Sequence, residues 1–224
     1  MRMRIILGLW IALFSCVTAV AAEGGWAVAG KAGTLGFGAD LHRALVPGWL
    51  SFRTGVGFFR YSLDISDNDI NYHARLKLET VPIGIDVYPF KNWFRLNGGL
   101  MINLNEVAAT ATPALGQITI NGTRYTAAQI GQLDAAVKFD RASPFVGLGF
   151  GRPFKNGKHW GFMFDLGAMY HGQAKLSLTT TMPPSSQLQN DLRQEEQRFA
   201  RDAKDYTWYP IIQFGLSYRF GATR

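Results

Sequence analysis

The chain has 224 residues, 23 basic and 16 acidic residues, a formal net charge of +7, and one cysteine. The basic residues are scattered and do not gather on one face or helix, which argues against a nucleic-acid-binding protein. One cysteine excludes a disulfide framework and a site built from several thiolates around a metal ion.

Residues 1–22 have the parts of a secretory signal peptide. Arg2 and Arg4 supply the positive start, an apolar run follows, and small residues precede a cleavage site that we expect after Ala22. The apolar run is too short to cross a bilayer as a helix, which needs about 20 residues. A lipoprotein-type signal at Cys16 is the alternative interpretation. In either case the sequence predicts an exported protein.

The mature chain, residues 23–224, consists largely of segments in which apolar and polar residues alternate. Alternation of this kind is typical of a strand with one apolar and one polar face. In chain order the segments are 26–45, 50–61, 76–87, 94–104, 136–150, 160–170 and 206–220. The first is long and rich in glycine, and its apolar parity changes between Val28 and Leu35. We therefore expect it to split into two strands around residues 30–33, which makes eight strands.

The segment 76–87 changes its apolar parity as well. Its apolar residues occupy even positions up to Leu78 and odd positions from Val81, with Pro82 at the change. Proline and a parity shift together are typical of a β-bulge. The sequence therefore predicts a bulge near this proline.

Short and long connections alternate between these segments. Short turns are predicted at 46–48, 89–92 and 155–158, and longer loops at 66–73, 110–133 and 180–205. Outer-membrane barrels have short periplasmic turns and long extracellular loops, whereas a soluble sandwich has no reason to separate its loops by length.

Two of the long loops contain local structure of their own. Asn121 and Gly122 form the dipeptide of a tight hairpin turn. Residues 186–205 have apolar side chains at helical spacing, and Ser186 with Gln189 fits a capping box. We expect one short amphipathic helix here, which covers the barrel mouth, binds a partner or folds back on the barrel rim.

The final strand, 206–220, carries a pattern of its own near the C-terminus. Gln213, Gly215, Tyr218 and Phe220 resemble the insertion signal by which bacterial outer-membrane barrels present their last strand to the barrel-assembly machinery. The alternative is a buried edge strand of a soluble β-sandwich. An exported chain of alternating segments without a membrane-spanning helix favours the first interpretation, because only a closed barrel satisfies the backbone in lipid.

The sequence therefore predicts an all-β protein, an antiparallel transmembrane β-barrel of eight strands in the bacterial outer membrane. Its expected partners are outer-membrane lipid and lipopolysaccharide, the assembly machinery during insertion, and a small solute. No cofactor, no metal and no nucleic acid are expected.

Several stretches in order resemble the CarO-type outer-membrane barrel proteins. They are residues 33–38, 121–125, 143–150, 160–161, 165–167 and 170–172, followed by the charged segment 195–205 and by 206–210. The resemblance implies a small eight-stranded barrel, without an obvious open pore, linked to uptake of basic amino acids such as ornithine. It supports the fold better than it supports transport.

Charged residues on the polar faces of the predicted strands are candidates for the barrel interior. They are Arg53, Glu79, Asp86, Arg95, Asp165 and Arg219. Charges in a narrow interior must be paired, because an unpaired buried charge costs several kcal/mol. One hypothesis is an ion-pair plug that closes the barrel. The other is a path for a zwitterionic or cationic solute, in which the three acidic residues hold an ammonium group and Arg53 or Arg95 holds a carboxylate.

Two further function classes stay open as alternatives. The long loops 110–133 and 180–205 could bind a partner in adhesion. A lipid-modifying enzyme would use a histidine near the outer rim, and His73 and His171 are the histidines nearest the predicted loop side. Neither lies in a recognised nucleophile or metal motif, so we expect no enzyme.

Overall fold

The computed structural model describes residues 25–67, 70–113, 117–154 and 159–220. The signal peptide predicted at 1–22 and the turn predicted at 155–158 lie outside these residues.

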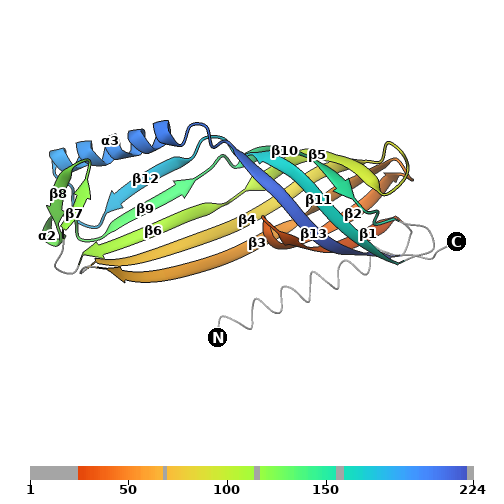
Figure 1. Ribbon diagram of the computed structural model, residues 1–224, viewed down its shortest axis with the longest axis horizontal. Coiled ribbons are helices and arrows are strands. Elements are labelled where there is room, and N and C mark those ends of the chain that lie inside the picture. Colours follow the sequence, from red (N-terminus) through yellow and green to blue (C-terminus); the bar gives the residue numbers. More distant parts are fainter. Residues whose placement is uncertain (1–24, 68–69, 114–116, 155–158, 221–224) are drawn as a thin grey trace.

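Eight strands close into an antiparallel barrel (Figure 1). They are β1 (Trp26–Gly33), β2 (Gly36–Val46), β3 (Leu50–Asp67), β4 (Ile70–Val87), β5 (Phe94–Asn103), β10 (Ala142–Phe150), β11 (Trp160–Tyr170) and β13 (Trp208–Phe220). They follow one another around the barrel in that order, and β13 pairs with β1 to close it. The eight-stranded prediction is confirmed.

The split of the N-terminal segment into two strands is also confirmed, although the turn lies one residue beyond the expected range. Thr34 and Leu35 join β1 to β2, and Gly36 follows with φ of 85°. A side chain is strained at that φ, so glycine is the residue that fits the turn. The Thr34 hydroxyl accepts from the Ile212 N–H, which ties this turn to β13.

Part of the barrel wall continues beyond the barrel as an open sheet, which we call the extension. The strands β3 and β4 have 18 residues each, and β6 (Glu106–Pro113), β9 (Leu133–Lys138) and β12 (Lys175–Thr180) continue beside them in the order β3-β4-β6-β9-β12. In Figure 1 these strands run far to the left of β1 and β13. The loop predicted at 66–73 is therefore wrong, because strands occupy it up to Asp67 and again from Ile70.

The connections at the other end, the turn end, are short as predicted. Three residues join β2 to β3 and six join β4 to β5. The separation by length is incomplete, because the tight Thr34–Leu35 turn lies at the end where the extension begins.

The predicted bulge at Pro82 is absent. The register of β3 against β4 stays constant from the Leu50–Val87 pair to the Asp67–Ile70 pair. One face of β4 is therefore continuous, and the parity change has another cause. Odd residues from Val81 onward are apolar on the outer face, whereas Lys77 and Glu79 on the same face are charged. The pattern therefore marks the border between the charged part and the apolar part of the outer face, and not a kink. We call the apolar part the apolar belt.

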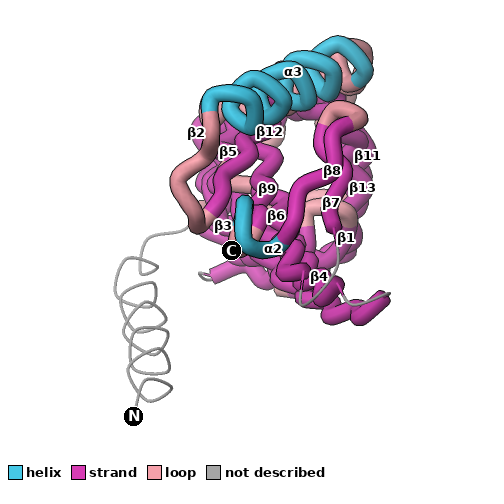
Figure 2. The backbone as a smooth tube through the Cα atoms, turned by 90° about the vertical axis from the view of Figure 1, so that its left-hand side faces the viewer, coloured by secondary structure: helices cyan, strands magenta, loops and turns pink. Residues whose placement is uncertain are grey.

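A helical cap covers the far part of the extension. It consists of α3 (Ser186–Asp202), the hairpin of β7 (Gln117–Ile120) and β8 (Thr123–Thr126), and the short α2 (Ala127–Ile130), which lie together at the extension end in Figure 2. The buried residues that join these elements are Ile120, Tyr125, Ile130, Leu188 and Leu192. The helix predicted at 186–205 is thus confirmed, and α2 is a second, short helix that the sequence did not indicate.

Two details of this cap test the sequence analysis. Asn121 and Gly122 have φ of 48° and 81°, so the predicted tight turn is confirmed. The helix cap is not Ser186 but Ser185, whose hydroxyl accepts from the Leu188 N–H at 3.2 Å. The predicted capping box at Ser186 is therefore wrong by one residue.

Large apolar side chains cover the outside of the barrel. Val146, Phe162 and Phe214 are 62%, 59% and 54% exposed. Exposed apolar area of this extent around a closed barrel with a polar interior is typical of a barrel that spans a bilayer.

None of the helices in the described part of the chain has the length and apolar character to cross a membrane.

Candidate functional site

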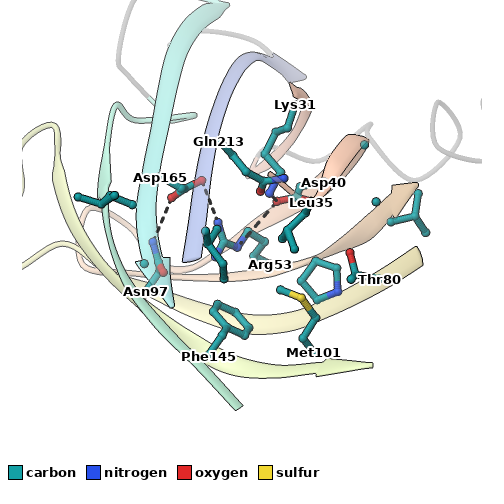
Figure 3. Close-up of a pocket in the computed structure, with 17 residues that line it drawn as sticks. Lys31, Leu35, Asp40, Arg53, Thr80, Asn97, Met101, Phe145, Asp165 and Gln213 are labelled. Carbon is teal, nitrogen blue, oxygen red and sulfur yellow. Dashed lines mark hydrogen bonds and ion pairs between the residues drawn. The ribbon is translucent and has the colours of Figure 1, made fainter. Parts of the chain in front are cut away.

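Charged side chains from six strands meet inside the barrel. Three are cations and three are carboxylates: Lys31, Arg53 and Arg95, and Asp40, Asp86 and Asp165. We call this group the lumen network. Figure 3 shows part of it, with Arg53 between Asp40 and Asp165. The formal charges of these six side chains balance, and His42 lies beside them, 3.4 Å from Asp86.

Asp165 of β11 accepts three side-chain hydrogen bonds from other residues of the barrel interior. Its carboxylate accepts from Arg95 Nη2 at 2.6 Å, from Asn97 Nδ2 at 3.0 Å and from Arg53 Nη1 at 3.3 Å. Arg95 is fully buried and also donates to the Gly151 carbonyl at 2.8 Å. Hydrogen-bonded ion pairs of this kind are among the stronger polar contacts in proteins.

The other two carboxylates are held by ion pairs. Lys31 Nζ lies 2.5 Å from Asp40, and Arg53 Nε is 3.8 Å from both Asp40 and Asp86. Asp86 also lies 3.4 Å from His42 Nδ1 and 3.8 Å from Arg95 Nε. The contacts of Asp86 are therefore longer than those of Asp40 and Asp165, and Asp86 is the carboxylate that its neighbours hold least closely.

Glycines on the inner face make room for these side chains. A Cβ added at Gly149 would lie 2.3 Å from Arg95 Nε, and one added at Gly55 would lie 2.3 Å from Asp40 Oδ1. Inner positions that lie next to a long charged side chain are therefore occupied by glycine. Small and large side chains together fill the interior of a narrow barrel in this way.

An apolar layer lies next to the lumen network, on the side of the extension. Its buried residues are Leu35, Met101, Phe145, Met169 and Ile211. All five come from the ends of strands or turns that face the extension. Four of these five residues (all but Met169), with Lys31, Asp40, Arg53 and Asp165, line a cavity with a volume of only about 20 Å³, and a single water molecule needs roughly 10–15 Å³ on such a measure.

The structure brings together four of the six charged residues that the sequence indicated: Arg53, Asp86, Arg95 and Asp165. The prediction that Glu79 faces inward is wrong. Its side chain lies on the outer face, 2.5 Å from Arg60 and 3.0 Å from Lys77. The expected parity failed because the supposed bulge is absent.

Arg219 lies apart from the lumen network, at the turn end of β13. Its backbone N–H donates to the His159 carbonyl, and in the described part of the chain its side chain makes no ion pair. The other residues of the predicted insertion signal have mixed positions: Gln213 is buried in the lumen, and Tyr218 and Phe220 lie on the opposite face of β13. Their role as an insertion signal stays a prediction.

Sequence reasoning missed Lys31, Asp40, His42 and Asn97. The first three lie on β1 and β2, where the glycine-rich pattern hid the strand boundaries. With the turn placed at Thr34, alternation assigns all three to the inner face.

The structure gives no support for a catalytic pair of histidines. His73 pairs with Asp64 on the extension, whereas the ring of His171 contacts Phe139 and Tyr209. The described residues contain no cluster of three or more side chains able to hold a metal ion.

Comparison with known proteins supports the fold. The chain matches no family model, and no curated protein matches it in sequence. Two solved structures are similar: Acinetobacter baumannii CarO2 at 22% identity and Acinetobacter baumannii CarO at 19%, each with a TM-score of 0.56. Each comparison covers 88% of this chain and 98% of the other. The resemblance to CarO-type barrels is therefore confirmed for the fold.

Proposed function

We propose that the protein is an integral outer-membrane β-barrel with a closed lumen, a structural surface protein that anchors the extension and its cap outside the cell. The filled lumen is the observation that carries this proposal. The lumen network and the apolar layer leave a cavity of about 20 Å³, which is too small for an amino acid.

The placement in the outer membrane has three supports. The sequence begins with a predicted signal peptide, the outside of the barrel is apolar, and the last strand carries the pattern of an insertion signal. Because short turns are periplasmic in such barrels, the turn end faces the periplasm and the extension faces the exterior.

A slow path for basic amino acids is the second candidate, as the resemblance to CarO-type proteins implies. One observation favours it: the contacts of the buried Asp86 with its arginine neighbours are long, at 3.8 Å from both Arg53 Nε and Arg95 Nε. In this candidate an ammonium group that enters from solution takes the place of Arg53 beside Asp86. Glu79 is no longer part of that path, since its side chain lies outside the lumen.

Loop-mediated adhesion is a further alternative, favoured by the folded cap. The cap has its own buried core, so it presents a fixed surface to a partner. Deleting 180–205 should abolish partner binding while the heat-modifiable band of the folded barrel persists on a gel.

Solute flux separates the two main candidates. The protein is reconstituted in liposomes, and entry of labelled ornithine is compared with entry into empty liposomes. A closed structural barrel gives equal rates. Ornithine entry faster than in empty liposomes, and slowed by unlabelled arginine, would contradict the structural proposal. The transport candidate would then take its place.

A further inference from the structure

Where the apolar belt ends, charged side chains cross the outer face of the extension in a row. The Cα pairings place one residue from each of five successive strands side by side: Arg60, Lys77, Glu106, Lys138 and Lys175. We call this the charged row. Alternate residues of a strand share a face, so the row lies on the same face as the exposed Ile83 and Ile102 of the apolar belt.

The next row outward leaves space around one arginine. Arg75 has small neighbours on its face, among them Ser62 on one side and Ala108 on the other. A hollow of about 330 Å³ results. The residues that line it are Arg60, Arg75, Lys77, Glu106 and Ala108. Three cations thus surround the hollow with one carboxylate.

These cations are only partly neutralised by their neighbours. Glu79 is shared, at 2.5 Å from Arg60 and 3.0 Å from Lys77. Arg75 makes no ion pair with any residue that the structure describes. The side chain of Arg60 is 69% exposed and that of Glu79 only 25%, so the carboxylate lies beneath and the guanidinium projects outward.

The rest of the charged row repeats this arrangement. Lys138 lies 3.7 Å from Glu106, and Lys175 lies 2.7 Å from Asp140. Both lysine side chains are more exposed than their partners, at 63% and 69%. A surface with projecting cations directly above lipid-facing residues is suited to anionic headgroups.

We propose that the hollow binds a phosphate group of lipid A in the outer leaflet. Arg60 and Arg75 supply planar forks that match phosphate oxygens, and Lys77 adds a point charge. The acyl chains then lie along the exposed apolar side chains beneath, such as Ile83 and Ile102. The inference rests on the proposed placement of the extension outside the cell.

Native mass spectrometry of the purified, detergent-solubilised barrel tests this site. The probes are diphosphoryl lipid A, enzymatically dephosphorylated lipid A and inorganic phosphate. The test variant is Arg60→Ala with Arg75→Ala and Lys77→Ala. The matched control removes the same three charges from the exposed face of α3, as Arg193→Ala with Arg198→Ala and Arg201→Ala.

We expect the test variant to bind diphosphoryl lipid A at least about tenfold more weakly than wild type, since each basic residue near such a surface contributes to binding. The control should bind as wild type does. Four outcomes would overturn the proposal. The test variant binds lipid A as tightly as wild type, or the control variant loses as much affinity as the test variant. The wild type binds dephosphorylated lipid A as tightly as diphosphoryl lipid A, or inorganic phosphate at the same concentration competes with diphosphoryl lipid A.

A single Arg75→Ala variant provides a second test in case the triple variant misfolds. It should fold normally, because Arg75 makes no ion pair with the described residues. It should weaken lipid A binding about threefold while the heat-modifiable band stays unchanged. Membrane fractionation is run in parallel. If the protein is recovered outside the outer membrane, the proposed placement is wrong. If it is recovered in the outer membrane but does not bind lipid A selectively, only the proposed lipid A site is wrong.

Discussion

Arg95 and Asp165 meet across the barrel interior, with Nη2 and Oδ1 2.6 Å apart and the two residues 0% and 4% exposed. They lie on β5 and β11, which are separated around the wall only by β10. The pair therefore ties together strands that do not hydrogen-bond to each other, at a place where both side chains are buried.

Asp165→Asn should destabilise the barrel strongly. It removes the carboxylate to which both Arg53 and Arg95 donate hydrogen bonds, and breaking a buried pair costs about 3–5 kcal/mol. Urea unfolding in detergent, followed by tryptophan fluorescence, measures the change. The double variant Arg95→Met with Asp165→Leu should lose less stability than the two single losses together, and simple additivity would argue against direct coupling.

Gly149→Val should destabilise the barrel by displacing Arg95. The added Cβ would lie 2.3 Å from Arg95 Nε, and overpacking of this kind costs about 1–3 kcal/mol. Gly30→Ala is the matched control, since no atom lies within 4 Å of a Cβ added there. Similar unfolding midpoints for the two variants would show that the inner glycine is not needed for space.

Tyr125→Phe should loosen α3 from the β7–β8 hairpin without affecting the barrel. The Tyr125 hydroxyl donates to Asp191 at 2.5 Å, and Asn121 donates to the same carboxylate at 3.1 Å. Amide hydrogen exchange in residues 186–202 should become several-fold faster, while exchange in β11 stays as it is. Unchanged exchange in the helix would remove the bond from the account of the cap.

The same contact predicts how the cap responds to pH. The hydrogen bond from Tyr125 lowers the pKa of Asp191. The stabilisation of the cap by the ionised carboxylate is therefore complete above about pH 4, and it is lost as the pH falls through the lowered pKa. Burial, and then the bond to Asp191, raise the pKa of Tyr125. Its contribution is therefore complete below about pH 10 and lost as pH rises through the raised value. The protection of the helix amides, measured relative to the intrinsic exchange rate at each pH, should fall at both extremes.

The sequence allowed the barrel strands to be predicted, because an exposed apolar outer face and a polar, filled interior impose strict alternation. Trp160–Tyr170 and Phe94–Leu104 show that pattern clearly, and their inner residues Arg95 and Asp165 were assigned correctly. The extension was not predicted. Within the extension the outer face of β4 is polar and its inner face is apolar, and this reversal has the same signature as a bulge at Pro82.

The network members on β1 and β2 were missed for a different reason. Glycine carries no side-chain signal, so neither the strand ends nor the inner face could be assigned from Gly30 to Gly38. Pairings between Asp40 and Lys31 or Arg53 depend on strand order and register, which the local pattern does not contain.

Removing large side chains from both the lumen network and the apolar layer should open the lumen. The variant Arg53→Ala with Phe145→Ala and Met169→Ala removes the guanidinium at the centre of the lumen network and two side chains of the apolar layer. Liposomes that contain it should release a trapped small dye several-fold faster than wild-type liposomes. A Phe37→Ala variant on the exposed outer face is the control and should release dye at the wild-type rate.

The closed lumen itself is tested most directly by ion conductance of the wild-type protein in planar lipid bilayers. We expect traces that match a protein-free membrane at moderate voltage, with the barrel verified as inserted. Steady, repeated conductance steps from the wild-type barrel would mean that the charges and the apolar layer leave a continuous aqueous path, and would contradict a closed lumen.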